Sequence, residues 1–121
     1  MSIDLILCGA SGRLGLEIVK EIENHHSIKL AGCISSKYNK SIGDKISAFT
    51  NSSFDVELKS SFEGILKPDV ILDVSSPNFF DEIVNFSKSN EAPLIVASTG
   101  HDDEQISMLK KLSESIPIMI A

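Results

Sequence analysis

The sequence has 121 residues, of which 42% are hydrophobic and 23% charged, and its formal net charge at pH 7 is −6. This composition is typical of one domain with a core of its own, and the negative charge argues against non-specific binding of nucleic acid. The longest apolar runs have the length of a strand, so no membrane segment is expected. No secretory leader is visible, and both cysteines fall in predicted strands. We therefore expect a cytoplasmic protein with reduced cysteines.

Apolar runs of strand length alternate with amphipathic segments along the first half of the chain. Residues 3–8 predict a buried strand, and the segment after it has the apolar spacing of a helix. Residues 28–34 predict a second strand. The polar segment 35–53 is expected to be a loop with room for one helical turn. A short edge strand over residues 54–58 and a brief helix over residues 60–66 complete this half.

The second half continues the same alternation. Its helices have recognisable starts, since Pro77 occupies a first helical position and Asp102 with Gln105 forms a capping box. The remaining strands are predicted over residues 69–74, 93–97 and 117–121. Because most of these strands are apolar throughout, we expect them to be buried on both faces.

Strands that alternate with helices favour right-handed crossovers and a mostly parallel sheet. The predicted fold is therefore α/β, a three-layer Rossmann-type arrangement with a six-stranded sheet in the order 3-2-1-4-5-6. We find no internal repeat and no linker, so residues 1–121 are expected to form one dinucleotide-binding domain.

Three glycines separate the first strand from the first helix, with the spacing G-x-x-G-x-x-G. Gly9 is expected to form the tight turn, Gly12 to let a pyrophosphate approach the backbone at the helix N-terminus, and Gly15 to let the helix pack closely. Ser11 is left able to donate a hydrogen bond to phosphate. The position after a first strand is the context that this motif requires. The alternative is a turn needed only for packing.

The end of the second strand bears on which nicotinamide cofactor is bound. NAD-specific domains carry an acidic residue there, which accepts from the ribose 2′-hydroxyl. This chain instead has Ser35, Ser36 and Lys37, in a loop with three lysines and one aspartate. Hydroxyls and positive charge suit a 2′-phosphate, so we expect NADPH to bind at least as well as NADH. The alternative is a solvated lysine loop without function.

Small and hydroxyl-bearing residues follow two further strands, at residues 73–77 and 97–100. Both segments lie at strand carboxyl ends, where backbone groups are able to approach the nicotinamide and its ribose. The alternative is that these residues only cap the helices that follow.

Four motifs in this order resemble the N-terminal domain of the dihydrodipicolinate reductase family, along the whole chain. They are GASGRLG at residues 9–15, DVSSP at 73–77, ASTGH at 97–101 and PIMIA at 117–121. The resemblance implies the nucleotide-binding domain of an NAD(P)H-dependent oxidoreductase, which transfers a hydride to a cyclic intermediate on the diaminopimelate route to lysine.

The resemblance also implies which residues hold NADPH or NADH. Residues 9–14 would hold the pyrophosphate and its ribose, Ser35 and Ser36 the adenosine ribose, residues 97–99 the nicotinamide end, and Ala121 the start of a hinge. With the strand-end residues above, the candidate cofactor-binding residues are Gly9, Ala10, Ser11, Gly12, Arg13, Leu14, Ser35, Ser36, Lys37, Ser75, Ala97, Ser98, Thr99 and Ala121.

Three of these positions depart from the family pattern. Leu14 replaces a methionine of similar volume. Ala97 adds a methyl group where the family has glycine. Ser35 stands where many members have an acid, which weakens an assignment to NADH.

The resemblance places the family's catalytic histidine pair, lysine and substrate loop in a second domain, which we expect to be absent from this chain. The dicarboxylate substrate would bind only with that domain, and the full-length parent is expected to be a homotetramer. We therefore expect no catalytic residue and no metal site here, and no turnover by this chain alone. His25 and His26 are interpreted as a solvated helix end, and His101 has no visible catalytic partner.

Other functions remain as alternatives to a reductase domain. A stand-alone NAD(H)-sensing module would predict an attached DNA-binding segment or a basic surface. An epimerase or short-chain dehydrogenase would require a Tyr-x-x-x-Lys pair, whereas Tyr38 is followed four residues later by Ile42. A phospho-receiver would need clustered acids at strand ends, and Asp73 stands alone.

Overall fold

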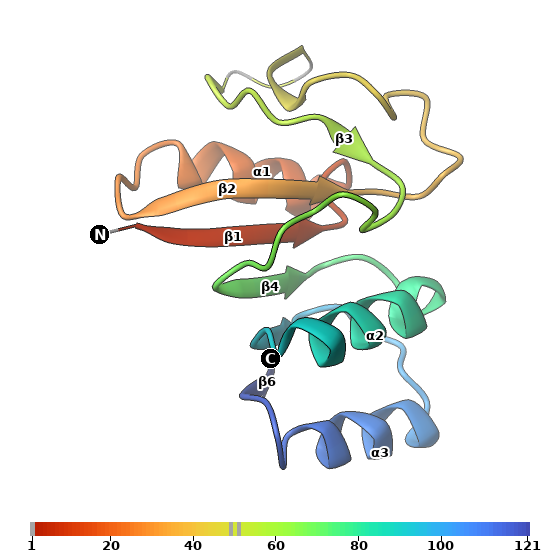
Figure 1. Ribbon diagram of the computed structural model, residues 1–121. Helices are drawn as coiled ribbons and strands as arrows, with labels where there is room; N and C mark the ends of the chain where they lie inside the picture. The colour runs from red at the N-terminus through yellow and green to blue at the C-terminus, as the bar shows by residue number, and fades with distance from the viewer. Residues whose placement is uncertain (1, 49, 51) are drawn as a thin grey trace.

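The computed structural model describes residues 2–48, 50 and 52–121, which fold into one sheet with helices on both sides (Figure 1). The strands are β1 (Ile3–Cys8), β2 (Ile28–Ile34), β3 (Leu58–Lys59), β4 (Val70–Asp73), β5 (Leu94–Val96) and β6 (Ile118–Ile120). The helices are α1 (Arg13–Ile22), α2 (Phe80–Asn90) and α3 (Asp103–Leu112), with 3₁₀ turns η1 (Ile46–Ala48) and η2 (Pro77–Phe79).

The six strands are parallel and follow the order β3-β2-β1-β4-β5-β6, which confirms the predicted topology. Strands β1 and β4 are neighbours although they are distant in sequence, and Cys8 pairs with Asp73 at their carboxyl ends. The connections turn away from each other at this point, so the loops that follow β1 and β4 leave a crevice between them.

The predicted edge strand over residues 54–58 is wrong in position. Only Leu58 and Lys59 pair with β2, and Glu57 makes an isolated antiparallel bridge to Lys45. The alternating apolar side chains of this segment pack on the hydrophobic cluster under α1 instead of extending the sheet. Side chains at alternate positions are therefore buried although the segment does not pair as a strand, and this is why the apolar alternation predicted an edge strand here.

The predicted brief helix over residues 60–66 is also wrong. The segment forms bends and a turn, and Gly64 has a φ of 78°, which lies outside the helical region. The expectation for residues 35–53 is confirmed for the described residues, which form a loop with the single 3₁₀ turn η1.

Helix starts follow the signals in the sequence. Pro77 opens the 3₁₀ turn η2, which leads directly into α2. Asp102 caps α3: its carboxylate accepts the Gln105 backbone N–H at 2.8 Å, and the Gln105 side chain accepts the Asp102 N–H at 3.0 Å. The predicted capping box is therefore confirmed.

Two hydrophobic clusters lie on opposite faces of the sheet. Helix α1 covers the first and α2 with α3 the second (Figure 1). The first contains Leu7, Ala10, Val19, Leu30, Cys33, Ile46 and Leu58. The second contains Ile6, Cys8, Ile34, Ile71, Phe80, Ile83, Val84, Ala92, Leu94, Val96 and Leu109. Both cysteines are buried free thiols, as expected.

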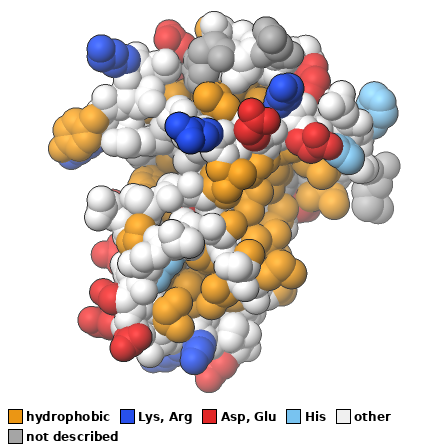
Figure 2. Space-filling model, turned by 180° about the vertical axis from the view of Figure 1, so that it is seen from behind, with side chains coloured by type: hydrophobic (Ala, Val, Ile, Leu, Met, Phe, Trp, Pro, Cys, Tyr) orange, Lys and Arg blue, Asp and Glu red, His pale blue; other side chains and the backbone are white. Residues whose placement is uncertain are grey.

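In the part of the chain that the structure describes, no helix covers the face of β4–β6 opposite α2 and α3 (Figure 1). Figure 2 shows a broad band of hydrophobic side chains on that side. Leu72, Ile95 and Met119 are cross-strand neighbours there, and exposure rises to 60% at Met119. The expectation that strands apolar throughout are buried on both faces is therefore wrong for β6. None of the helices in the described ranges has the length and the hydropathy that a bilayer-spanning segment requires.

Candidate functional site

The corner between β1 and α1 is built so closely that two of its glycines leave no room for a side chain. Gly9 has a φ of 88°, and a β-carbon there would lie 2.8 Å from the backbone of Ser75. A β-carbon on Gly15 would lie 2.0 Å from the Gly9 carbonyl oxygen. Gly9 therefore makes the predicted tight turn, and Gly15 allows the predicted close approach of α1.

Gly12 differs from both, because the space beside it is open. A β-carbon there would meet only the Gly9 carbonyl oxygen within 4 Å, at 3.4 Å. Gly12 is also the N-cap of α1, and no side chain of the described residues caps this helix end by a hydrogen bond. Backbone N–H groups of a first helical turn that have no capping partner favour an anion, as does the helix dipole.

A cleft of about 620 Å³ lies over this corner, at the carboxyl ends of β1, β2 and β4. Its lining brings together several of the predicted cofactor-binding residues, namely Gly9, Ser11, Gly12, Ser35, Ser36, Lys37 and Ser75. Their convergence from three separate segments follows from the strand order. The residues present thus offer an open glycine, an uncapped helix end and hydroxyl groups, which fit a dinucleotide phosphate.

Hydroxyl groups tie the glycine corner to the loop after β2. The hydroxyls of Ser11 and Ser35 lie 2.6 Å apart, and Ser35 Oγ accepts the Ser11 backbone N–H at 3.2 Å. Asn39 donates its side-chain amide to Ser11 Oγ at 2.9 Å. If the Ser35 hydroxyl donates as well, both lone pairs of Ser11 Oγ are used and its own proton is free for a phosphate oxygen.

The positive charge of the loop after β2 is not all directed at the cleft. Lys37 lines it and lies 5.2 Å from the centroid of the Tyr38 ring. Lys45 forms an ion pair with Asp55 instead, and Lys40 is exposed outside the cleft lining. One lysine of the three is therefore placed to meet a ligand in the cleft.

A buried carboxylate organises the loops after β4 and β5. Asp73 Oδ1 accepts both the backbone N–H of Ser75, at 2.8 Å, and its hydroxyl, at 2.5 Å. Asp73 Oδ2 accepts the hydroxyl of Ser98 at 3.1 Å. Ser75 and Ser98 are thus held by one side chain.

The other predicted residues lie outside the cleft lining. Ala10 is fully buried in the cluster under α1, while Arg13 and Leu14 are exposed on the first turn of that helix. Residues 97–99 follow β5, and the Ala121 N–H donates to the Val96 carbonyl at 2.9 Å.

Sequence reasoning included Val74 and Ser76 in the segment 73–77, but it missed five other residues of the cleft, namely Tyr38, Ser60, Asn78, Phe79 and Glu82. Tyr38 directly follows Lys37, and Asn78 and Phe79 belong to the turn that Pro77 opens. The helix after β4 starts at the same edge of the sheet as the glycine corner. From the strand order alone, the residues at its start could therefore have been predicted to line the cleft.

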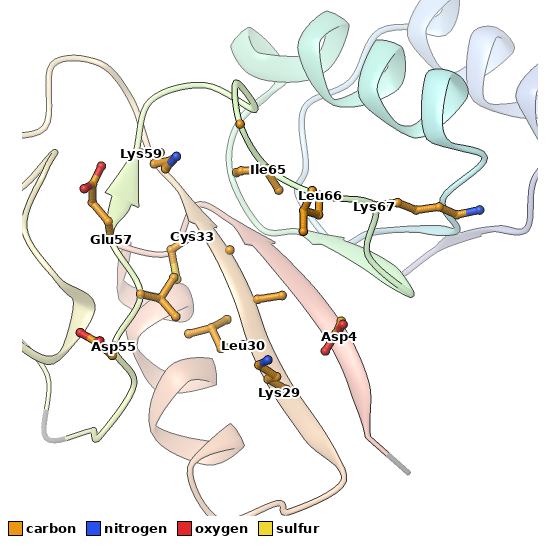
Figure 3. A pocket seen from close by; sticks show the side chains of 14 residues that line it. Asp4, Lys29, Leu30, Cys33, Asp55, Glu57, Lys59, Ile65, Leu66 and Lys67 are labelled. Carbon is orange, nitrogen blue, oxygen red and sulfur yellow. The ribbon is translucent and has the colours of Figure 1, made fainter.

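A second cavity of about 470 Å³ lies along β2 and the crossover to β4 (Figure 3). It contains none of the predicted cofactor-binding residues, and its charged lining mixes lysines with carboxylates: Asp4, Lys29, Asp55, Glu57, Lys59 and Lys67. Leu66, 87% exposed, lies at its border. The mixed charges indicate no preference for an anion or a cation.

The histidines and cysteines take no part in the cleft. His25 forms an exposed pair with Glu21 near the end of α1, and His101 packs against the Phe80 ring. Burial raises the pKa of Cys33 to about 12, and burial, with the negative charge of Asp73, raises the pKa of Cys8 well above 9.0. Over the described part of the chain, no three His, Cys, Asp or Glu residues gather as metal ligands.

Comparison with known proteins agrees with this geometry. A family model described as dihydrodipicolinate reductase, N-terminus, matches residues 3–121. The 4-hydroxy-tetrahydrodipicolinate reductase of Pelagibacter ubique (strain HTCC1062) is 29% identical over 98% of this chain and 43% of its own length. That of Buchnera aphidicola subsp. Cinara cedri is 31% identical over 95% of this chain and 43% of its own length. The chain therefore spans less than half the length of these relatives.

Two solved structures share the fold. Dipicolinate-bound dihydrodipicolinate reductase from Paenisporosarcina sp. TG-14 has a TM-score of 0.73 and 25% identity, covering 100% of this chain and 47% of that one. Aspartate semialdehyde dehydrogenase with NADP from Candida albicans has a TM-score of 0.64 and 14% identity, covering 99% of this chain and 42% of that one. The second likeness concerns the fold alone.

Proposed function

The chain belongs to the dihydrodipicolinate reductase family, whose N-terminal part it matches, and on this premise we propose that it is the dinucleotide-binding part of a 4-hydroxy-tetrahydrodipicolinate reductase. In this role it binds NADPH or NADH at the carboxyl ends of β1, β2 and β4. The cofactor, when bound, supplies the hydride for the reduction. The residues of this chain bind the cofactor and orient its nicotinamide ring.

The observation that carries this proposal is the contrast between the N-termini of α1 and α3. Helix α3 satisfies its first N–H groups with its own Asp102 and Gln105 side chains. Helix α1 has no such cap, and Gly12 leaves the space before it clear. An uncapped helix end beside an open backbone, in a cleft lined by hydroxyl groups, supports the binding of a diphosphate.

The residues that line the cleft after β2 bear on whether NADPH or NADH binds more tightly. Ser36 and Lys37 follow β2, where a carboxylate would favour the free 2′-hydroxyl of NADH. A lysine there favours a 2′-phosphate instead, since the added phosphate charge is negative. NADPH is therefore expected to bind at least as tightly as NADH, and Tyr38 offers a ring face beside that position.

We also propose that this chain alone turns over no substrate. In the described part of the chain, the titratable residues that line the cleft are Lys37, Tyr38 and Glu82. None of the three has a hydrogen-bonded partner of the kind that activates a proton donor. We propose that the whole reductase is needed to bind the dicarboxylate substrate and to donate the proton. The whole reductase is also the form that we expect to assemble into a homotetramer.

Titration of the chain with NADPH and NADH, followed by the fluorescence of the reduced nicotinamide, tests the proposal directly. The sequence contains no tryptophan that would interfere. Saturable binding of both cofactors is expected, with competition by ADP-ribose. Gly12→Val should abolish it, since the extended backbone at Gly12 accepts valine but the side chain would fill the phosphate position.

Ala31→Val serves as the matched control, because Ala31 is exposed on β2 and lines the other cavity. It should bind both cofactors as the unmodified chain does. Absence of binding to the unmodified chain, or normal binding by Gly12→Val, would contradict the proposed function.

A further inference from the structure

Asp73, the last residue of β4, has a carboxylate that is buried behind the ligand cleft. The residue is 2% exposed and is not among those that line the cleft. Within the described residues, no lysine, arginine or histidine forms an ion pair with it. A buried carboxylate without a cation is costly unless hydrogen bonds replace its water. The donors on Ser75 and Ser98 therefore decide whether this charge is tolerated.

These donors belong to different loops. Ser75 lies between β4 and α2, and Ser98 lies between β5 and α3. The backbone adds a third connection, since the Ala97 N–H donates to the Asp73 carbonyl at 2.8 Å. The backbone of Ser75 in turn lies against the tight turn at Gly9. One side chain thus connects the glycine corner with the loop after β5.

We propose that Asp73 is a positioning residue for the nicotinamide end of the cofactor, acting through Ser75 and Ser98. The inference rests on the proposed function. A dinucleotide bound where the strand order reverses lies across the boundary between β1 and β4, with one nucleotide on each side. Lys37 and Tyr38 lie on the β2 side, so the other nucleotide extends over the loops that Asp73 holds.

The proposal separates the two halves of the site. On the β2 side, Ser35 and Asn39 hold the loop through Ser11, and within the described residues neither side chain is hydrogen-bonded to Asp73. Loss of the Asp73 carboxylate should therefore release the loops after β4 and β5 while the adenosine side stays in place. A residue that served only the stability of the fold would affect both halves alike.

Two pairs of ligands distinguish these cases: NADPH against 2′-phospho-ADP-ribose, and NADH against ADP-ribose. Each second ligand lacks the nicotinamide. Affinities are measured by calorimetry for Asp73→Asn, Asp73→Ala and Ser98→Ala. Asp69→Ala is the matched control, because Asp69 lies just before β4 at the opposite edge and accepts a backbone N–H of Asp4 at 2.7 Å. Thermal unfolding of each variant reports whether it is folded.

Asp73→Ala should bind NADPH and NADH about tenfold more weakly, which corresponds to about 1.4 kcal/mol, and bind the ligands without nicotinamide within about twofold of normal. Ser98→Ala should show part of this loss and add little to Asp73→Ala, since both changes remove the same tether. Asp73→Asn keeps the shape and should be intermediate. Asp69→Ala should bind all four ligands normally.

Equal weakening of both members of a pair, or unchanged binding of all four ligands, would overturn the positioning role and leave the proposed function standing. If Asp73→Ala does not fold, Ser98→Ala decides, since it removes one hydroxyl and leaves the carboxylate with Ser75. Failure of the unmodified chain to bind any of the four ligands would overturn the proposed function and this inference with it.

Discussion

The α-carbon of Gly15 lies so close to the Gly9 carbonyl that a β-carbon there would be 2.0 Å from its oxygen. Such a contact cannot be relieved by a side-chain rotation, because the backbone fixes the position of a β-carbon and the atom it meets is a main-chain oxygen. The first turn of α1 and the end of β1 must therefore move apart if any larger residue is placed at position 15.

Gly15→Ala is expected to lower the free energy of unfolding by about 3 kcal/mol or more, as overpacking against a rigid partner does. Gly12→Ala should cost about 1 kcal/mol or less, because its β-carbon meets one atom at 3.4 Å. Urea unfolding followed by circular dichroism measures both. Similar stabilities for the two variants would show that the glycine corner is softer than its geometry indicates.

Lys37→Glu should weaken the binding of NADPH by about tenfold or more and that of NADH much less, since only NADPH carries the 2′-phosphate. Lys40→Glu makes the same change of charge outside the cleft lining, and should alter both affinities only slightly. Parallel titrations at two salt concentrations separate local contact from general repulsion. An unchanged NADPH affinity in Lys37→Glu would leave the solvated lysine loop as the better interpretation.

The cysteines predict a loss of stability in alkaline solution. Burial raises the pKa of Cys33 from 9.0 to about 12, so the folded chain keeps a proton that the unfolded chain releases above pH 9. Unfolding is then favoured as pH rises from 9 toward 12, by about 1.4 kcal/mol per pH unit for each such thiol. Cys33→Ala should flatten this dependence in urea unfolding measured from pH 7.5 to 10.5. Parallel curves for the two chains would contradict it.

His101→Phe should stabilise the chain. Among the described residues, His101 Nε2 is buried with no hydrogen-bond partner, and the ring already packs against Phe80 at a centroid distance of 5.4 Å. Replacing an unsatisfied polar atom with an apolar ring of similar shape should raise the free energy of unfolding by about 1 kcal/mol. Thermal unfolding checks the sign, and a lower midpoint for the variant would show that Nε2 is satisfied in solution.

The parts of the molecule that sequence reasoning predicted share one property, a strong local pattern. The glycine spacing, the apolar strands and the capping box at Asp102 each depend on residues close together in the chain. From strand order alone, loops after β1, β2 and β4 could be expected to converge, and Ser11, Ser35 and Ser75 do line one cleft.

The failures have physical causes of their own. Residues 54–57 have the alternation of a strand, but their apolar side chains pack under α1 without pairing. Residues 60–66 contain Gly64, whose positive φ ends any helix there. The hydrogen bond between Asp73 and Ser98 joins the last residue of β4 to the loop after β5, and hydrogen bonds of that kind leave no periodic pattern in a sequence.

The contact between Gly9 and Ser75 has a consequence for how the site comes into being during synthesis. The glycine motif leaves the ribosome before the loop after β4, yet the main chain that supports its turn belongs to that loop. Until β4 has been synthesised and pairs with β1, the nascent chain contains the glycine motif but not the main chain that supports its turn. The ligand cleft is therefore complete only after the loop that follows β4 has been synthesised, well after the glycine motif itself.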